Sequence, residues 1–445
     1  MMHKAIFLAI SVLLINLVGC WRSEPVLPPN TAPLKIGYLS QFATSLQNPV
    51  IIEAAQAEIN AADMAIDDIN SNGGVLGMDV SLIRKETYGD EKTAIEEAQV
   101  LDDEEQVPVI IGAWRSSSTI AVATEVTIPE KILQISPVST APEITDLKDD
   151  NFVFRTIASD AILGAVVGRL MMDLGFETAS IMYVQNAYGE GLKDKVKTAL
   201  EESGGSILQE VPHEENIQKT IMSDSKESEA FWMEQLQTAM KDEPHVILWI
   251  GYAEETNEMI PFSIKQGLAD NFMLVDPDLL HPFLRTDHSK DCPKSSSAAN
   301  APSIGRWLEA LEGTFGASPS GGSSEQRKSL ALQYNDLYTE EGTYAFHTYD
   351  AVVLAALAAE KAGSTTDSQL IRDSLKDVAN PPGEIVGPGK EGIARALDLV
   401  RQGIEIDYFG AAGPQNFDEH GDVLSDIEVW KVLGGVICTD QAAAQ

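Results

Sequence analysis

Short apolar runs alternate with amphipathic stretches along most of the chain after residue 33. The runs have the length and composition of buried strands, and they occupy residues 34–39, 80–83, 107–111, 132–135, 179–184, 246–250 and 272–275. The stretch after the first run has helical spacing over residues 53–71 and ends at Asn72-Gly73-Gly74. Short buried strands separated by helices predict a parallel sheet covered by helices on both faces.

The number of strand–helix units exceeds what one sheet comfortably holds, so we predict an α/β protein with two doubly wound, Rossmann-like lobes. Two further regions follow: the sequence predicts a helix of small residues over 351–362 and two or three strands within 406–436. Residues 291–304 and 313–326 are rich in Ser, Gly, Ala and Pro, which predicts exposed loops.

The N-terminus has the layout of a secretory signal. Lys4 precedes an apolar stretch over residues 5–18 that is too short for a confident membrane span. Its end, Leu17-Val18-Gly19-Cys20, resembles a bacterial lipobox, in which the cysteine becomes the lipidated first residue. The alternative is an ordinary signal peptide with a chance cysteine. We therefore predict a signal peptide over 1–19, and a lipidated Cys20 with a Pro-rich tether over 20–33.

Charge and cysteine content narrow the function further. The formal net charge of −37 disfavours binding to nucleic acid, because an acidic surface repels phosphate backbones. Beyond Cys20, only Cys292 and Cys438 remain. In an oxidising compartment two such cysteines most often pair, which predicts a disulfide, with two free thiols as the alternative.

Hydroxyl-bearing residues follow two of the predicted strands. Residues 109–119 run from a strand through Gly112 into four consecutive hydroxyls, Ser116 to Thr119, and residues 135–143 run through Ser136 to Thr140. Hydroxyls at helix starts cap backbone N–H groups, and Thr140 with Glu143 predicts a capping box. The same groups also make a carboxylate site at the end of a sheet, so both interpretations stay open.

At this point the chain resembles the type I extracytoplasmic solute-binding proteins of ABC transporters, in the leucine/isoleucine/valine-binding family. The resemblance covers most of residues 34–280 and resumes over about 330–432. Its matching stretches are INAADMAIDDINSNGG, IIGAWRSSST, ISPVSTAPEIT, FRTIASD, YGEGL, GYAEETNEM, HTYDAVVLAALAAE and NFDEHGD. The expected organisation is lobe I at 34–157 and 327–400, lobe II at 158–326 and 401–436, a three-strand hinge, and a C-terminal tail at 437–445.

The resemblance also implies an amino-acid site between the lobes. Lobe I would supply Ser116, Thr140 and the backbone of Val138 and Ser139, and lobe II would supply Tyr188, Tyr252 and Asp276, or Asp278 after a two-residue shift. Considered singly, each tyrosine could be a half-buried surface aromatic, and either aspartate a turn residue beside a proline. Together these groups suit a zwitterion, which leaves water only when both of its charges are paired.

Two departures leave the ligand's side chain open. The family often has an aromatic residue where residues 52–57 have none, and Trp114 and Arg115 flank the hydroxyl cluster. The ligand could be a branched-chain amino acid, another amino acid, an amide or a small carboxylate. We expect the protein to be a monomer that delivers its ligand to a membrane permease. We expect it to have no enzymatic activity and to bind no metal or cofactor. The alternatives are a sensory module for a membrane receptor, an extracellular enzyme, and a structural lipoprotein.

Overall fold

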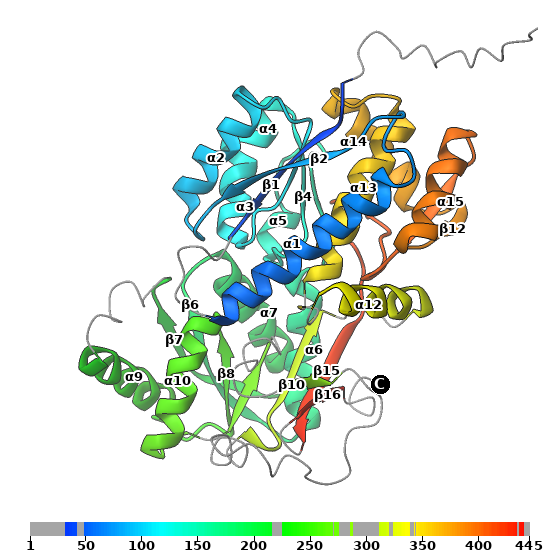
Figure 1. The fold of residues 1–445 in the computed structure, drawn as a ribbon. Helices are drawn as coiled ribbons and strands as arrows, with labels where there is room; N and C mark the ends of the chain where they lie inside the picture. Colours follow the sequence, from blue (N-terminus) through cyan, green and yellow to red (C-terminus); the bar gives the residue numbers. More distant parts are fainter. Residues whose placement is uncertain are drawn as a thin grey trace, which may run out of the picture.

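The computed structural model describes residues 32–41, 49–215, 225–269, 271–275, 285–287, 311–319, 324–338, 342, 344–433 and 436–439. These residues form two α/β lobes, stacked one above the other in Figure 1. The predicted α/β architecture with two lobes is confirmed. Within the described residues, no helix is both long enough and apolar enough to cross a membrane.

Lobe I contains a parallel five-stranded sheet in the order β2-β1-β3-β4-β5. Its strands are β1 (Lys35–Ser40), β2 (Ser81–Glu86), β3 (Val109–Ile111), β4 (Leu133–Ser136) and β5 (Val153–Arg155). All are largely buried except β2, an edge strand whose residues are exposed or half-buried. Its helices are α1 (Pro49–Asn70), α2 (Glu91–Asp103), α3 (Ser116–Val122), η1 (Ala123–Thr127), α4 (Ile128–Glu130), α5 (Pro142–Thr145), α12 (Glu325–Leu337), α13 (Ala345–Ala362), α14 (Ser368–Ala379) and α15 (Gly389–Arg401).

Helices cover both faces of this sheet. On one face α1 and α13 pack in the largest hydrophobic core, and on the other α2 and α3 pack with β1 and β3. Every residue of α13 from Ala345 to Glu360 is buried, because its run of small side chains lets α1 and α14 approach closely. The doubly wound arrangement places the carboxyl ends of β3 and β4 at the edge that faces the other lobe.

Lobe II contains an eight-stranded sheet in the order β10-β16-β15-β11-β9-β8-β6-β7. The strands are β6 (Thr178–Val184), β7 (Ser206–His213), β8 (Val246–Ile250), β9 (Phe272–Leu274), β10 (Arg285–Asp287), β11 (Phe315–Pro319), β15 (Ile427–Leu433) and β16 (Val436–Thr439). Helices α6 (Asp160–Asp173) and α7 (Ala187–Glu202) cover one face, and α9 (Ser225–Ala239) and α10 (Ala253–Gln266) cover the other.

The structure corrects three predictions about the second half of the chain. Residues 406–423 were expected in lobe II, but β13 (Ile406–Gly410) pairs with β12 (Glu384–Val386) and β14 (Gly413–Pro414), and this segment packs in the lobe I core. The expected tail begins with a strand, since β16 pairs with β15. The expected loop at 313–326 contains β11, a buried strand of small residues beside the indole of Trp430.

The described chain passes between the lobes after β5, between β11 and α12, and again before β15. The first and last of these crossovers lie beside each other at the lobe I end, because the backbone N–H of Arg155 donates to the carbonyl oxygen of Gly421 at 2.9 Å. These two crossovers therefore form one hinge region next to the end of β4, where the backbone N–H of Thr156 donates to the carbonyl oxygen of Ser136 at 3.2 Å.

Candidate functional site

The first strand end of the candidate site belongs to β3 and the start of α3. Gly112 has a φ of +118°, and a Cβ there would lie 2.1 Å from the carbonyl oxygen of Leu39, so the tight turn requires glycine. The turn delivers Ser116, which is 4% exposed, to the helix start. Its Oγ accepts a hydrogen bond from the backbone N–H of Ala141 at 3.2 Å, which joins the two strand ends.

The four hydroxyls do not act as simple helix caps. The residue at the cap position of α3 is Arg115, which makes no side-chain capping bond. Among the described residues, Ser117 Oγ and Ser118 Oγ have no hydrogen-bond partner, whereas Thr119 Oγ1 donates to the carbonyl oxygen of Ala113 at 3.1 Å. Both oxygens are buried, so neither is satisfied by solvent.

The second strand end belongs to β4 and the start of α5. Ser139 Oγ lies 2.7 Å from Thr119 Oγ1, and its backbone N–H donates to Ser136 Oγ at 3.1 Å. Val138 and Thr140 are also buried in this turn. The predicted capping box of Thr140 with Glu143 is wrong: Ala141 occupies the cap position of α5, and the hydroxyl of Thr140 turns to another partner.

That partner is Asp160, a residue that the sequence analysis did not select. Thr140 Oγ1 donates to Asp160 Oδ2 at 2.8 Å, and the backbone N–H of Asp160 donates to the carbonyl oxygen of Thr140 at 2.8 Å. Asp160 is 1% exposed, and its Oδ1 has no hydrogen-bond partner in the described part of the chain. Burial raises the pKa of its carboxyl to about 7, against the opposing effects of the Thr140 bond and the Arg155 charge.

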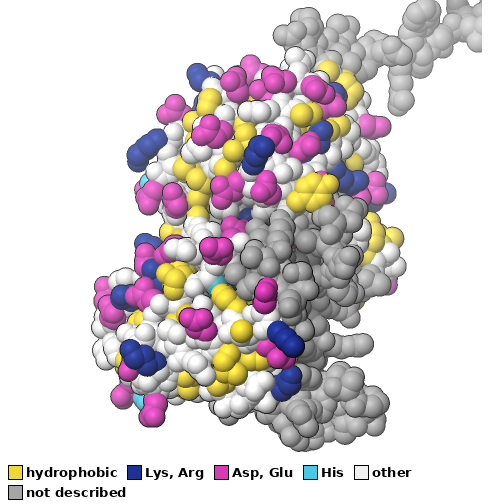
Figure 2. Space-filling model, turned by 90° about the vertical axis from the view of Figure 1, so that its left-hand side faces the viewer, with side chains coloured by type: hydrophobic (Ala, Val, Ile, Leu, Met, Phe, Trp, Pro, Cys, Tyr) yellow, Lys and Arg dark blue, Asp and Glu magenta, His cyan; other side chains and the backbone are white. Residues whose placement is uncertain are grey.

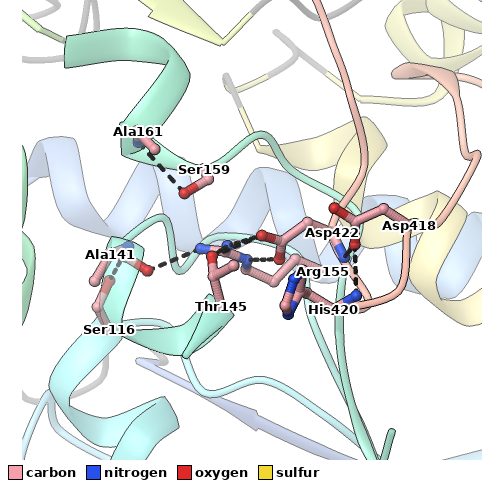
Figure 3. Close-up of polar contacts among 9 residues, drawn as sticks. All are labelled: Ser116, Ala141, Thr145, Arg155, Ser159, Ala161, Asp418, His420 and Asp422. Atoms are coloured by element: carbon pink, nitrogen blue, oxygen red, sulfur yellow. Dashed lines mark hydrogen bonds and ion pairs between the residues drawn. The ribbon is translucent and has the colours of Figure 1, made fainter. Parts of the chain in front are cut away.

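A local signal for Asp160 was present in the sequence. Ser159 caps α6 by accepting a hydrogen bond from the backbone N–H of Ala161 at 3.3 Å (Figure 3). The aspartate that follows is therefore not needed as a cap. An acid directly after a sufficient cap, at the end of the FRTIASD stretch, could have been selected as a candidate ligand group.

Lobe II contributes Tyr252 and Tyr188. Tyr252 lies at the start of α10, where its backbone N–H donates to Glu255 Oε2 at 2.8 Å, and its hydroxyl accepts a bond from Asn186 Nδ2 at 2.9 Å. The rings of Tyr188 and Tyr252 stack with their centroids 5.8 Å apart. Burial raises the pKa of the Tyr252 phenol, so the hydroxyl stays protonated at neutral pH. Asp276 and Asp278 lie outside the described residues.

Trp114 and Arg115 connect the two lobes at this point. The guanidinium carbon of Arg115 lies 4.4 Å above the Tyr252 ring, and Arg115 Nη1 pairs with Glu215 Oε1 at 2.5 Å. The Trp114 ring lies 6.2 Å from that of Tyr252, and its Nε1 donates to Glu58 Oε1 on α1 at 2.8 Å. Trp114 therefore places an aromatic ring beside α1, the helix whose residues 52–57 contain none.

The groups brought together here are hydroxyls, a buried carboxyl, aromatic faces and a paired guanidinium. Groups of these kinds can bind and orient polar solutes, and the side chains just described form no reacting pair of nucleophile and base. Among the residues that the structure describes, no group of three His, Cys, Asp or Glu side chains could hold a metal ion.

Comparison with known proteins assigns the family. Residues 57–435 match the family model described as receptor family ligand binding region. The chain is 27% identical over 388 residues to the chemotactic signal transduction system substrate-binding protein BasB of Halobacterium salinarum, which covers 86% of this chain and 82% of that protein. It is 28% identical over 331 residues to the Leu/Ile/Val-binding protein homolog 1 of Brucella melitensis, covering 74% of this chain and 79% of that protein.

Solved structures show the same fold. The leucine-binding protein LivK of Thermotoga maritima superposes with a TM-score of 0.69 at 21% identity, covering 92% of this chain and 97% of that one. LivJ of Streptococcus pneumoniae, solved with isoleucine, gives a TM-score of 0.67 at 18% identity, covering 92% and 99%. The chain belongs to the receptor ligand-binding region family and is a type I periplasmic binding protein of the Leu/Ile/Val-binding group, a group of substrate-binding proteins and not of enzymes.

Proposed function

We propose that this protein captures an amino acid, or a related small zwitterion, between its lobes outside the cytoplasm and delivers it to an ABC importer. The observation that carries the proposal is the meeting of the two lobes at the candidate site. Arg115 and Trp114 of lobe I contact Tyr252 of lobe II, directly beside the buried Ser116. A ligand held there touches both lobes, so it stabilises the closed arrangement by differential affinity.

The two strand ends suit the carboxylate of such a ligand. The Ser116 hydroxyl, which accepts from the backbone N–H of Ala141, can donate its own proton to a carboxylate oxygen, with the backbone of Val138 and Ser139 alongside. The ammonium group suits Asp160 Oδ1, which has no hydrogen-bond partner among the described residues, together with the predicted Asp276 or Asp278. The Tyr252 ring supplies an aromatic face, which also favours a cation.

The relatives support the ligand class without fixing its side chain. The Brucella relative is named for leucine, isoleucine and valine, and LivJ was solved with isoleucine. A solute-binding protein of Rhodopseudomonas palustris with the same fold, at a TM-score of 0.65, was solved with benzoate. The shared chemistry of these ligands is a carboxylate, which the strand ends of β3 and β4 are proposed to bind.

A second candidate is a sensory role with the same ligand chemistry. BasB, a relative matched over most of both chains, is named as the substrate-binding protein of a chemotactic signal transduction system. Loss of ligand uptake in cells that lack this chain supports the importer, whereas intact uptake with a lost tactic response supports the sensor.

We also propose that Cys20 carries a lipid that anchors the protein to the cell envelope, with residues 20–33 as the tether. Cys20 lies outside the described residues.

We further propose a disulfide between Cys292 and Cys438. Cys292 lies outside the described residues, whereas Cys438 is buried on β16. Asp287, five residues before Cys292 in the sequence, is the register partner of Cys438 where β10 pairs with β16. This register supports the proposed disulfide between Cys292 and Cys438. The surface in Figure 2 carries acidic side chains over both lobes, which suits a solvated exported protein.

A thermal-shift screen of amino acids, amides and small carboxylates tests the proposal. The protein should give a hit that Ser116→Ala combined with Thr140→Ala weakens by roughly 30- to 1,000-fold, since each lost hydroxyl interaction is worth about 1–2 kcal/mol. Thr124→Ala is the matched control, because within the described residues Thr124 Oγ1 donates only to the backbone carbonyl oxygens of Ile120 and Ala121, one turn earlier. Unchanged affinity in the double variant would show that the site is elsewhere.

A further inference from the structure

A buried ion pair joins two of the interlobe crossovers. Arg155, the last residue of β5, is fully buried, and it meets Asp422 with Nε donating to Oδ1 at 2.7 Å and Nη2 to Oδ2 at 2.6 Å (Figure 3). This is the two-bond fork that gives arginine–carboxylate pairs their directional strength. Arg155 precedes the first crossover and Asp422 precedes the last, so the pair fixes the lobe I ends of both.

The same guanidinium also reaches the candidate ligand site. Arg155 Nη1 donates to the carbonyl oxygen of Ala141 at 2.9 Å, and Nη2 donates to Thr145 Oγ1 at 2.7 Å. Ala141 and Thr145 mark the start and end of α5, and the backbone N–H of Ala141 donates to Ser116 Oγ. One side chain therefore connects the hinge, the start of α5 and Ser116, as Figure 3 shows.

The acidic side of the pair is equally well held. Asp418 Oδ1 accepts the backbone N–H groups of His420 at 2.8 Å and Asp422 at 3.0 Å, which closes a tight turn. Gly421 in this turn has a φ of +78°, and a Cβ there would lie 2.4 Å from the carbonyl oxygen of Val153. The turn thus presses directly against β5 and presents the Asp422 carboxylate to Arg155 in one orientation.

Hydrogen bonds to lobe I also fix both ends of the first crossover, at Thr156 and at Asp160. Thr156 Oγ1 donates to the carbonyl oxygen of His347 at 2.9 Å, and His347 Nδ1 lies 2.7 Å from the carbonyl oxygen of Thr156. At the lobe II end, Asp160 makes its two hydrogen bonds to Thr140. Only residues 157–159 lie between these anchors, so a rotation of lobe II about this crossover must be taken up there or transmitted to Thr140.

We propose that Arg155 is a positioning residue that couples the hinge to the ligand site: paired with Asp422, it fixes the first and last crossovers and the start of α5 as one unit. The inference rests on the proposed function only in taking Ser116 and Thr140 as ligand groups. Movement of lobe II then changes the geometry of the ligand site through this network, and loss of the network uncouples the two.

Hydrogen–deuterium exchange on the full exported chain, without ligand, tests the coupling. Asp422→Asn keeps the shape of the side chain but removes the charge that pairs with Arg155. We expect amide exchange to rise about tenfold or more in segments 139–146 and 155–160, where local opening no longer breaks an ion pair, while β8 and β6 keep their protection. Glu384→Gln is the matched control, because it disrupts the forked Arg395–Glu384 pair, which is half-exposed and lies away from the hinge.

If Asp422→Asn does not fold, Thr145→Val replaces it, since it removes only the hydroxyl that bridges Arg155 and Asp422. A smaller rise confined to the same two segments supports the coupling. Unchanged exchange in a folded variant, or an equal rise throughout the lobe I core and in Glu384→Gln, overturns it. Because no ligand is used, these outcomes are independent of whether an amino acid binds.

Discussion

Asp160 gives the protein a pH dependence that can be assigned to one side chain. Its pKa is raised from 3.8 to about 7 by burial. Between these values the folded state keeps a proton that the unfolded state has lost, so the free energy of unfolding falls by about 1.4 kcal/mol per pH unit. The contribution is fully present below pH 4 and is lost as the pH rises through 7, for a total of about 4 kcal/mol.

Asp160→Asn removes this pH-dependent contribution to the free energy of unfolding. An asparagine there can still accept the Thr140 hydroxyl, and its amide nitrogen replaces an oxygen that has no partner among the described residues. We expect the variant and the parent to be similarly stable at pH 4, and the variant to be more stable at pH 8 by up to about 4 kcal/mol. Urea unfolding followed by circular dichroism at both pH values measures the difference.

Asp350 provides the contrasting control. Burial also raises its pKa to about 7, but its Oδ1 accepts from Tyr408 and Ala411, and its Oδ2 from Ala412. Asp350→Asn places an amide N–H against a backbone donor, so at pH 4, where Asp160→Asn should cost little, it should lower the free energy of unfolding by about 1–3 kcal/mol. If the Asp160→Asn and parent stabilities differ by the same amount at pH 4 and pH 8, the assigned protonation of Asp160 is wrong.

Three further outcomes are expected. Gly112→Ala should lower the free energy of unfolding in chemical denaturation by at least about 2 kcal/mol, because it adds a clash with the Leu39 carbonyl to the cost of a positive φ. Gly77→Ala, which has open space around it, should lower it by only about 1–2 kcal/mol. Equal losses in the two variants would contradict this reasoning. Binding of an amino acid at pH 6 should release up to about one proton, since an ammonium next to Asp160 favours its ionised form; calorimetry in two buffers measures the release, which should vanish at pH 8.5 and in Asp160→Asn. Trp114→Phe should lower the urea-unfolding free energy by about 1–3 kcal/mol, because it removes the indole bond to the buried Glu58 carboxylate; an unchanged midpoint would contradict it.

Strands that are continuous apolar runs can be predicted from the sequence. A buried strand made of small or polar residues cannot, because its composition is that of a loop. β1 and β8 are recognisable because their buried residues, from Ile36 onward in β1 and throughout β8, are apolar or small. β11 is buried too, but its Gly, Ala, Ser and Pro residues have the composition of a loop. Its position is decided by the neighbouring strands and Trp430, which a local pattern does not contain.

Non-local pairing also explains the wrong lobe boundary. The short strand β13 could join either sheet by its sequence, and its place is set by β12 and by the Tyr408 hydroxyl bond to Asp350. The same limit applies to the site. Ser116 and Thr140 could be selected because each directly follows a strand, whereas Arg155 and Asp422 are 267 residues apart and only the fold brings them together.

The most direct measurement is a crystal structure of the protein grown with the amino acid that gives the largest thermal shift. The account predicts a ligand between the lobes, with its carboxylate within hydrogen-bonding distance of Ser116 or Thr140 and the ring of Tyr252 against it. A ligand bound elsewhere, or one between the lobes that touches neither hydroxyl, would contradict the account.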